Sequence, residues 1–155
     1  TDVYYTSDLV MVVKKGGKYE NATKLSDFKG ATITGQLNTF HYTVIDQIDG
    51  VKKDTAMDNF PAMRVALESG KIDGYVSERP EGISATSANK NFAMVEFKEG
   101  QGFKTSDEDT AIAVGLKKDS DLKDKINKIL AGISEDERKD LMDQAIKDQP
   151  ASEDN

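Results

Sequence analysis

Short apolar runs alternate with helix-type patterns along most of the chain. Runs rich in β-branched and aromatic residues predict strands, and apolar residues three and four positions apart predict helices. We expect strands at 3–5, 9–13, 31–34, 51–57, 72–76, 92–97 and 110–116. We expect helices at 40–48, from Asp58 or Asn59 to Gly70, and at 80–88. This alternation predicts an α/β fold with a mainly parallel sheet flanked by helices.

The run Leu9–Val13 is continuously apolar, which is typical of a strand covered on both faces. The strand at 110–116 has a similar buried-type pattern, and residues 100–109 before it form a polar loop. Two helices end the chain, and Ser134 with Glu137 predicts a capping box at the start of the second. No strand follows for these helices to cover. Their apolar faces therefore need a partner outside the unit formed by residues 9–109.

Composition excludes several classes of function. The net charge of −7 and the pI of about 4.8 argue against nucleic-acid binding, because no basic run is available to neutralise phosphates. The absence of cysteine excludes disulfides, thiolate nucleophiles and cysteine-based zinc sites. Asp119, Asp121 and Asp124 lack the spacing of a calcium loop and are better explained as helix-capping residues. We expect no metal and no cofactor. The chain also has no apolar run of the roughly 20 residues that a membrane helix requires.

The stretch from Lys71 to Gly82 holds the first candidate binding residues, Ser77 and Glu78. They follow a short apolar strand and precede a helix, and ligands of open α/β sheets bind at the carboxyl ends of strands. Two interpretations of Glu78 remain open. It accepts hydrogen bonds from a cationic ligand group, or it is a first-turn acid favoured by the helix dipole, worth roughly 0.3–1 kcal/mol.

The turn from Gly35 to Phe40 joins another strand to a helix. Its unpaired backbone N–H groups, at Thr39 to His41, are suited to a carboxylate or phosphate. If this strand and that of Glu78 are parallel neighbours, an anion site and a cation site lie side by side. An α-amino acid carries both groups. His41 is the only histidine, and we expect it at the surface or rim, since no second His or Cys can form a metal site or triad with it.

Four segments in this order resemble the extracytoplasmic substrate-binding proteins of polar amino-acid ABC transporters. The segments are VYYTSDLVMVVKK, LSDFKGATITGQLNTF, ALESGKIDGYVSERPEG and DTAIAVGLKKDSDLKDKINKIL, and they cover nearly the whole chain. This is solute-binding protein family 3, and the sequence is most similar to Gram-positive, streptococcal-type members. The resemblance implies a type II periplasmic-binding-protein fold, a two-lobed clamshell that closes on one amino acid.

The resemblance also implies roles for individual residues. The family's carboxylate-binding turn usually carries Gly-Thr, which matches Asn38 and Thr39, followed by Phe40. Asn tolerates left-handed backbone angles, so the turn can survive the loss of glycine. The family's ammonium-binding acid, normally Asp, matches Glu78, with Ser77 beside it. The longer Glu side chain can move the ammonium group or change specificity.

The resemblance further implies that most of lobe 1 is missing before Thr1. Residues 10–109 then form the inserted lobe 2, and residues 1–9 and 110–155 form the hinge strands and a remnant of lobe 1. The chain has no initiator Met and no signal sequence, so we expect the gene product to begin before Thr1. We expect the truncated chain to hide its exposed helix pair by self-association or a domain swap.

The leading hypothesis is therefore a non-enzymatic binding protein. It captures a polar or cationic α-amino acid outside the membrane, as a cell-surface lipoprotein or a periplasmic protein made with a signal sequence, and delivers it to the permease. Two alternatives remain. One is a dehydratase-type enzyme on the same fold, with Glu78 or His41 as general acid, and the other is a ligand-sensing domain of a receptor.

Overall fold

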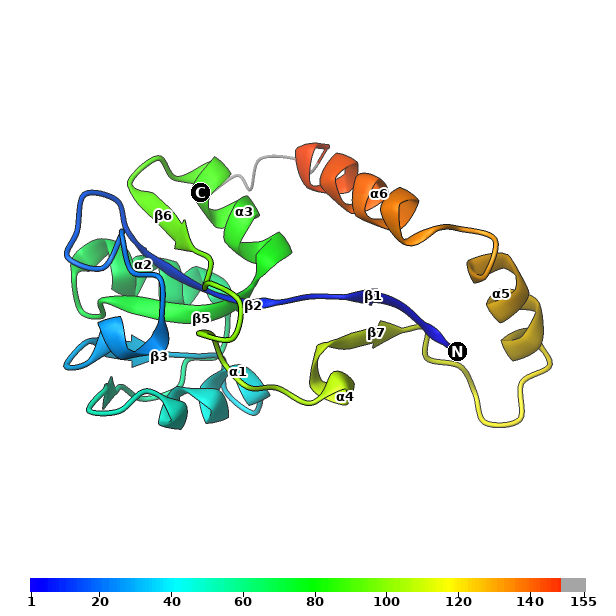
Figure 1. The fold of residues 1–155 in the computed structure, drawn as a ribbon, viewed down its shortest axis with the longest axis horizontal. Helices are drawn as coiled ribbons and strands as arrows, with labels where there is room; N and C mark the ends of the chain where they lie inside the picture. Colours follow the sequence, from blue (N-terminus) through cyan, green and yellow to red (C-terminus); the bar gives the residue numbers. More distant parts are fainter. Residues whose placement is uncertain (149–155) are drawn as a thin grey trace. The chain divides into compact units, whose positions relative to one another are not determined.

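The computed structural model describes residues 1–148 and divides the chain into two compact units. The first, which we call the sheet unit, is Asp8–Thr105. The second, the terminal unit, combines Thr1–Ser7 with the segment that begins at Ser106 (Figure 1). Within the described residues, none of the helices has the length and apolar character needed to span a bilayer.

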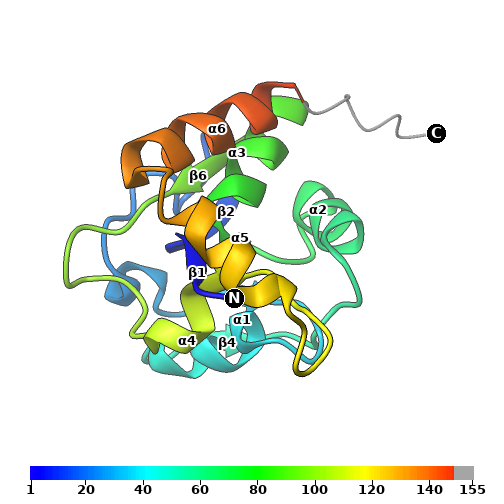
Figure 2. The ribbon, with the colours of Figure 1, turned by 90° about the vertical axis from the view of Figure 1, so that its right-hand side faces the viewer.

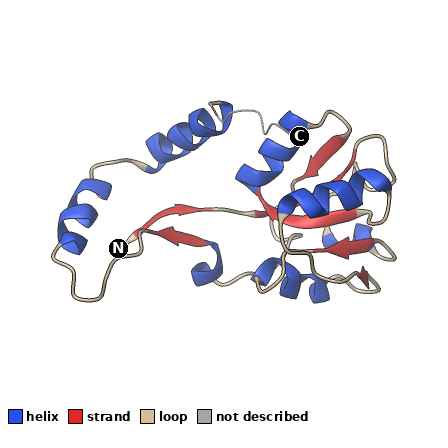
Figure 3. Cartoon of the chain, turned by 180° about the vertical axis from the view of Figure 1, so that it is seen from behind, coloured by secondary structure: helices blue, strands red, loops and turns tan. Residues whose placement is uncertain are grey.

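A five-stranded sheet forms the centre of the sheet unit (Figure 3). Its strands, in spatial order, are β4 (Lys52–Lys53), β3 (Thr32–Thr34), β5 (Gly74–Glu78), β2 (Leu9–Lys14) and β6 (Phe92–Val95). Strand β3 is parallel to both β4 and β5, whereas β2 is antiparallel to β5 and β6. Every strand except β2 therefore points the same way. This confirms the mainly parallel sheet that the alternation of elements predicts.

Helices cover both faces of this sheet. Helices α2 (Phe60–Ser69) and α3 (Arg79–Ala88) pack on one face, where Val12 and Tyr75 join their buried residues in one apolar cluster. The 3₁₀ helix η1 (Leu25–Phe28), the short helix α1 (Phe40–Thr43) and the 3₁₀ helix η2 (Val44–Gln47) cover the other face. There Met11 and Val13 join the second cluster. Residues Leu9–Val13 are all buried, as expected for a strand covered on both faces.

The ends of α2 follow from three residues, two of which, Asn59 and Gly70, the sequence analysis identified. The Asn59 side chain accepts a hydrogen bond from the Ala62 N–H at 2.9 Å, which satisfies one of the free donors at the helix start. Pro61 lies in the first turn, where its missing N–H has no cost. Gly70 ends the helix with φ of 81°, a left-handed conformation that glycine adopts without a steric penalty.

Two predicted elements of the sheet unit are much shorter than expected. The helix predicted at 40–48 ends as α-helix at Thr43 and continues only as the 3₁₀ turn η2. Thr43, Val44 and Ile45 are consecutive β-branched residues, which lose side-chain freedom in a helix and weaken it. The strand predicted at 51–57 is reduced to the two residues of β4.

The described part of the terminal unit contains a two-stranded antiparallel ribbon and three helices. The ribbon pairs β1 (Val3–Thr6) with β7 (Ala111–Ala113). The helices are α4 (Asp107–Thr110), α5 (Leu122–Leu130) and α6 (Glu135–Lys147), and Figure 2 shows α5 and α6 as separate helices joined by a short connection. The predicted capping box of α6 is confirmed, with the Ser134 N–H donating to Glu137 Oε2 at 2.8 Å. Residues 107–109, expected in a loop, and Thr110, expected in a strand, form α4, which Ser106 and Asp109 begin with a second capping box.

The prediction of a buried strand at 110–116 is wrong. Strand β7 spans only three residues, which are partly or largely exposed, and Val114 beyond it is 37% exposed. Helix α6 contacts the ribbon through β1, where Arg138 donates to the Tyr4 carbonyl at 3.3 Å, and β7 remains partly exposed. Among the described residues, every buried hydrophobic side chain belongs to the sheet unit, from Leu9 to Val95. The described part of the terminal unit therefore has no buried apolar core of its own.

Candidate functional site

The turn after β3 and the end of β5 lie at the same edge of the sheet. Strands β3 and β5 are parallel neighbours, with Thr34 opposite Tyr75 in the register. Parallel neighbours bring their carboxyl ends together. The turn from Gly35 to Phe40 and the carboxylate of Glu78 are therefore adjacent, as the predicted pair of anion and cation sites requires.

The turn is tight at two positions. A Cβ atom on Gly35 would lie 2.9 Å from backbone atoms of His41 and Tyr42, so any side chain there would force the turn away from α1. Asn38 has φ of 60°, the left-handed conformation expected for a residue in the place of the family's glycine. The start of α1 is thus held against the end of β3.

Thr39 precedes α1 as its N-cap, without a capping bond from its side chain. Its hydroxyl instead donates to the Gln36 carbonyl at 2.8 Å, which closes the turn. The first N–H groups of a helix have no partner within the helix, so the amides near Thr39 and Phe40 are the available donors here. This arrangement can bind a small anionic group such as a carboxylate.

Glu78 is the last residue of β5 and the N-cap of α3, where its side chain makes no capping bond. Its side chain is 30% exposed, and Oε1 lies 3.6 Å from Nε2 of His41. The acid therefore combines access to solvent with a contact to the opposite turn. This placement is suited to an ammonium group, which an ionised carboxylate binds through charge-assisted hydrogen bonds.

The prediction that His41 lies at the surface or rim is wrong. The residue is only 8% exposed, because its ring packs against Phe40 at 4.4 Å and Phe60 at 6.5 Å between centroids. An aromatic side chain with one polar edge is readily buried when its neighbours are aromatic. The absence of a second His or Cys excluded a triad but gave no information on burial.

Ser77 points into a buried polar cluster on the α2–α3 face. It is fully buried, and its hydroxyl donates to Glu81 Oε2 at 2.5 Å. The other carboxylate oxygen of Glu81 accepts from Arg64 Nη2 at 2.8 Å and from the Tyr75 hydroxyl at 3.4 Å. Burial raises the pKa of Tyr75, and the Glu81 charge adds to this shift, so the phenol remains a donor.

Sequence reasoning missed Glu81, Arg64 and Tyr75. The alternation of β5 places Tyr75 and Ser77 on one face, and an acid in the first turn of the next helix is within their reach. That signal could have identified Glu81. Nothing in the spacing of the sequence indicates Arg64, which comes from a different helix.

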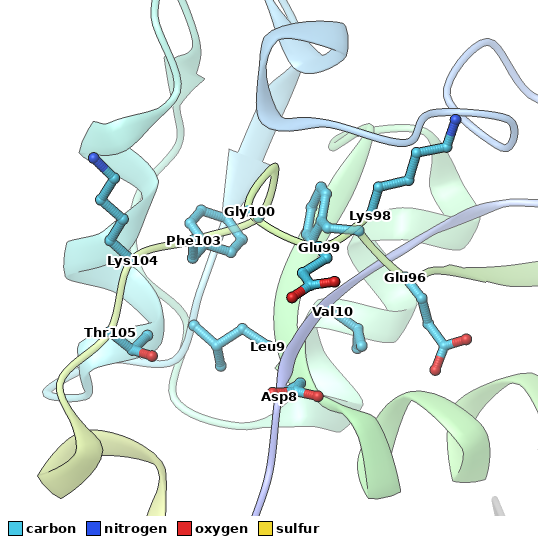
Figure 4. A pocket seen from close by; sticks show the side chains of 12 residues that line it. Asp8, Leu9, Val10, Glu96, Lys98, Glu99, Gly100, Phe103, Lys104 and Thr105 are labelled. Carbon is cyan, nitrogen blue, oxygen red and sulfur yellow. The ribbon is translucent and has the colours of Figure 1, made fainter.

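A separate cavity of about 650 Å³ lies beside the start of β2 (Figure 4). Residues 96–105 form much of its wall, and Leu9 and Phe103 are among its apolar lining. Asp8 and Glu99 also line it, whereas none of the five predicted ligand residues does so. It lies across β2 from Glu78, because Leu9 is the register partner of Glu78. Among residues 1–148 no group of three potential ligands could hold a metal ion.

No protein-family model matches the sequence, and no curated protein is similar to it. Solved structures do match. An amino acid ABC transporter substrate-binding protein from Streptococcus pneumoniae, bound to L-arginine, superposes with a TM-score of 0.73 at 22% identity. The match covers 95% of this chain and 60% of that one. The chain therefore has the fold of the matched part of an amino acid ABC transporter substrate-binding protein, which confirms the predicted α/β, periplasmic-binding-protein-like fold class.

Two further structures define the likeness more closely. An ancestral arginine-binding protein bound to arginine matches with a TM-score of 0.65 and 28% identity, over 94% of this chain and 62% of that one. Domain 2 of an arginine-binding protein, TmArgBP, matches over 95% of its own length and 61% of this chain, with a TM-score of 0.51 at 20% identity. The chain thus spans less than two thirds of the two longer proteins but nearly all of the single domain.

Proposed function

We propose that this chain is part of the substrate-binding component of an ABC transporter, which captures an α-amino acid outside the membrane and delivers it to the permease. The observation that carries the proposal is the placement of the Thr39 turn and Glu78 at adjacent ends of two parallel strands. The structures of like fold that bind arginine support an amino acid as ligand. The acid at the site favours a polar or cationic one.

The five predicted residues take distinct roles in this proposal. Glu78 holds the ligand's ammonium group, and the backbone amides of Thr39 and Phe40 hold its carboxylate. Asn38 has the left-handed backbone conformation, with φ of 60°, that orients those amides. The role of Ser77 is indirect. Its hydroxyl donates to Glu81 and so holds Glu81 in the first turn of α3, beside Glu78.

We assign residues 10–109 to lobe 2, and residues 1–9 and 110–155 to the hinge strands and a remnant of lobe 1. Support comes from the division of the structure at Asp8 and Thr105 and from the match to a single domain 2. A cell-surface lipoprotein or periplasmic location, with a signal sequence on the precursor, follows from the proposed role in transport.

We also propose self-association through the terminal unit. Leu122, Ile129 and Leu141 are 47%, 67% and 61% exposed on α5 and α6. Apolar side chains concentrated on an uncovered helix pair favour association, and exchange of the pair between two copies is a low-cost way to cover them.

Replacing Glu78 by Ala tests the proposed binding site. A charge-assisted hydrogen bond contributes about 1.5–3 kcal/mol, so the affinity for the amino acid that binds should fall at least about tenfold. Isothermal titration calorimetry against a panel of amino acids, L-arginine first, measures this loss. A selective ligand should also raise the melting temperature of the unmodified chain, by mass action.

The matched control is Glu99→Ala, which removes a carboxylate from the cavity in Figure 4. We expect this variant to bind as the unmodified chain does. If Glu99→Ala lost binding while Glu78→Ala kept it, the ligand site would lie in the cavity, and the assignment of Glu78 would be wrong.

A further inference from the structure

Among the described residues, His41 has a buried ring nitrogen without a hydrogen-bond partner. Its Nδ1 lies 3.2 Å from the Thr39 hydroxyl oxygen. Its Nε2 is buried and has no hydrogen-bond partner among the described residues. The nearest charged atom, Glu78 Oε1, lies 3.6 Å away, which is too far for a hydrogen bond.

The hydrogen bonds of Thr39 determine which ring nitrogen carries the proton. The Thr39 hydroxyl has one hydrogen, and it donates that hydrogen to the Gln36 carbonyl at 2.8 Å. Thr39 can therefore only accept from His41, so Nδ1 is the donor. In the neutral imidazole Nε2 is then an acceptor, and its lone pair faces the Glu78 carboxylate, which is also an acceptor.

Two acceptors face each other and no donor lies between them. A proton on Nε2 supplies that donor, because the imidazolium can donate to Glu78 Oε1 in a charge-assisted hydrogen bond. When Nε2 is neutral, nothing holds Glu78 on His41, and both carboxylate oxygens are available to the 30% exposed side of the residue. The protonation state of His41 thus decides where Glu78 makes its bonds.

The groups that face His41 come from β5, from α2 and from its own turn. On β5 the facing acid is Glu78, and α2 presents the Phe60 ring to His41. Arg64 of α2 and Glu81 of α3 bond each other on the side of Tyr75. On its own turn, His41 meets the neutral Thr39 and Phe40.

We propose that His41 is the positioning residue of Glu78 and makes amino-acid binding sensitive to acid. This inference rests on the proposed function, in which Glu78 holds the ligand's ammonium group. Protonated His41 competes with that ammonium for the same carboxylate, so the affinity is high when His41 is neutral and low when it is charged.

The first test compares the affinity for L-arginine at about pH 8 and about pH 5.5, the range in which histidine is the side chain that ordinarily changes charge. Because His41 is the only histidine, no other imidazole contributes. We expect the affinity of the unmodified chain to fall about tenfold or more on acidification, the effect of losing one charge-assisted bond. In His41→Gln, the ratio of the two affinities should be close to one. Equal pH dependence in both proteins, or none in the unmodified chain, would overturn the inference and leave the binding function intact.

The second test needs no ligand. The ring signals of His41 can be followed by NMR during a pH titration of the unmodified chain and of Glu78→Gln. Because Nε2 of His41 lies 3.6 Å from Glu78 Oε1, the pH response of the ring signals should differ between the unmodified chain and Glu78→Gln. If the transitions coincide, His41 and Glu78 are not coupled and the inference is wrong.

A chain that shows this difference but binds no amino acid at either pH would contradict the proposed function alone. His41→Asn replaces His41→Gln if circular dichroism shows that the latter does not fold.

Discussion

Gly35 lies where β3 turns into α1, and the backbone of α1 fills the space that a side chain would need. An added Cβ would meet the carbonyl carbon and oxygen of His41 and the Cα of Tyr42, all at 2.9 Å. These are backbone atoms, which cannot rotate away as the end of a flexible side chain can. The position of Thr39 and His41 relative to β3 therefore depends on the absence of a side chain at Gly35.

Gly35→Ala should destabilise the chain by about 1–3 kcal/mol, the usual cost of overpacking. Urea unfolding followed by circular dichroism measures the free energy. The control is Leu37→Ala in the same turn, because Leu37 is 46% exposed and its backbone bond to Met57 survives the change. Leu37→Ala should alter stability by no more than about 0.5 kcal/mol. Equal stability of Gly35→Ala and the unmodified chain would show that α1 can move away from β3 freely.

At this scale the sequence predicts backbone constraints better than side-chain environments. The left-handed residue Asn38 could be identified, because few residue types tolerate that conformation. The burial of His41 could not, because it depends on Phe60, which comes from another helix. Likewise, the hydrogen bond from Ser77 to Glu81 follows from how α3 packs on β5. The roles of the five candidate residues in binding stay predictions.

Among the elements, α2, α3 and β5 are joined by one carboxylate. Glu81 lies at the start of α3 and accepts hydrogen bonds from Arg64 of α2 and from Tyr75 and Ser77 of β5. The Arg64 and Glu81 side chains are 23% and 16% exposed, so solvent screens this pair only in part. Loss of one partner leaves the other charge without compensation in a site that is mostly out of water.

Glu81→Ala should therefore cost about 3 kcal/mol of unfolding free energy, whereas the double variant Arg64→Ala/Glu81→Ala should cost less than the sum of the single changes. The comparison is Glu96→Ala, which breaks a pair with Arg79 of the same 2.8 Å length but with side chains 42% and 56% exposed. Such exposed pairs contribute about 0–1 kcal/mol. Strictly additive effects in the double variant would mean that Arg64 and Glu81 act independently.

Elements with strong end signals were predicted most accurately. Helix α2 begins at a capping Asn59 and ends at Gly70, and α6 begins at the Ser134 capping box. These signals are local, so a single sequence contains them. By contrast, the apolar pattern at 110–116 predicts burial, but burial requires another layer of structure. The contact of α6 with the ribbon is made through β1, and β7 stays partly exposed.

At the scale of the whole molecule, the buried hydrophobic side chains among the described residues are confined to one unit. All buried hydrophobic residues among the described ones lie between Leu9 and Val95, on both faces of a complete five-stranded sheet. The terminal unit contributes Ser7 as its only buried described residue. Since burial of apolar surface is the dominant favourable term in folding, the sheet unit holds most of the stability.

The fragment Asp8–Thr105 should therefore fold alone and unfold cooperatively, with a melting temperature within about 5 °C of that of the whole chain, a shift equivalent to roughly 1 kcal/mol. The crystal structure of a single domain 2 with the same fold supports this expectation. A fragment of residues 14–105 is the matched control, because it lacks the apolar part of the central strand β2 and should not fold. If the fragment Asp8–Thr105 failed to fold, the terminal unit would contribute packing that the buried residues do not indicate.

The same two proteins test the proposed self-association. Light scattering at high concentration should give a mass above that of a monomer for the whole chain, because Leu122, Ile129 and Leu141 are exposed on its terminal helices. The fragment Asp8–Thr105 lacks these helices and should remain monomeric. Replacing Ile129 and Leu141 by Lys in the whole chain should lower the mass toward the monomer without changing the unfolding of the sheet unit. A monomeric whole chain would contradict self-association, and association of the fragment would place the interface on the sheet unit instead.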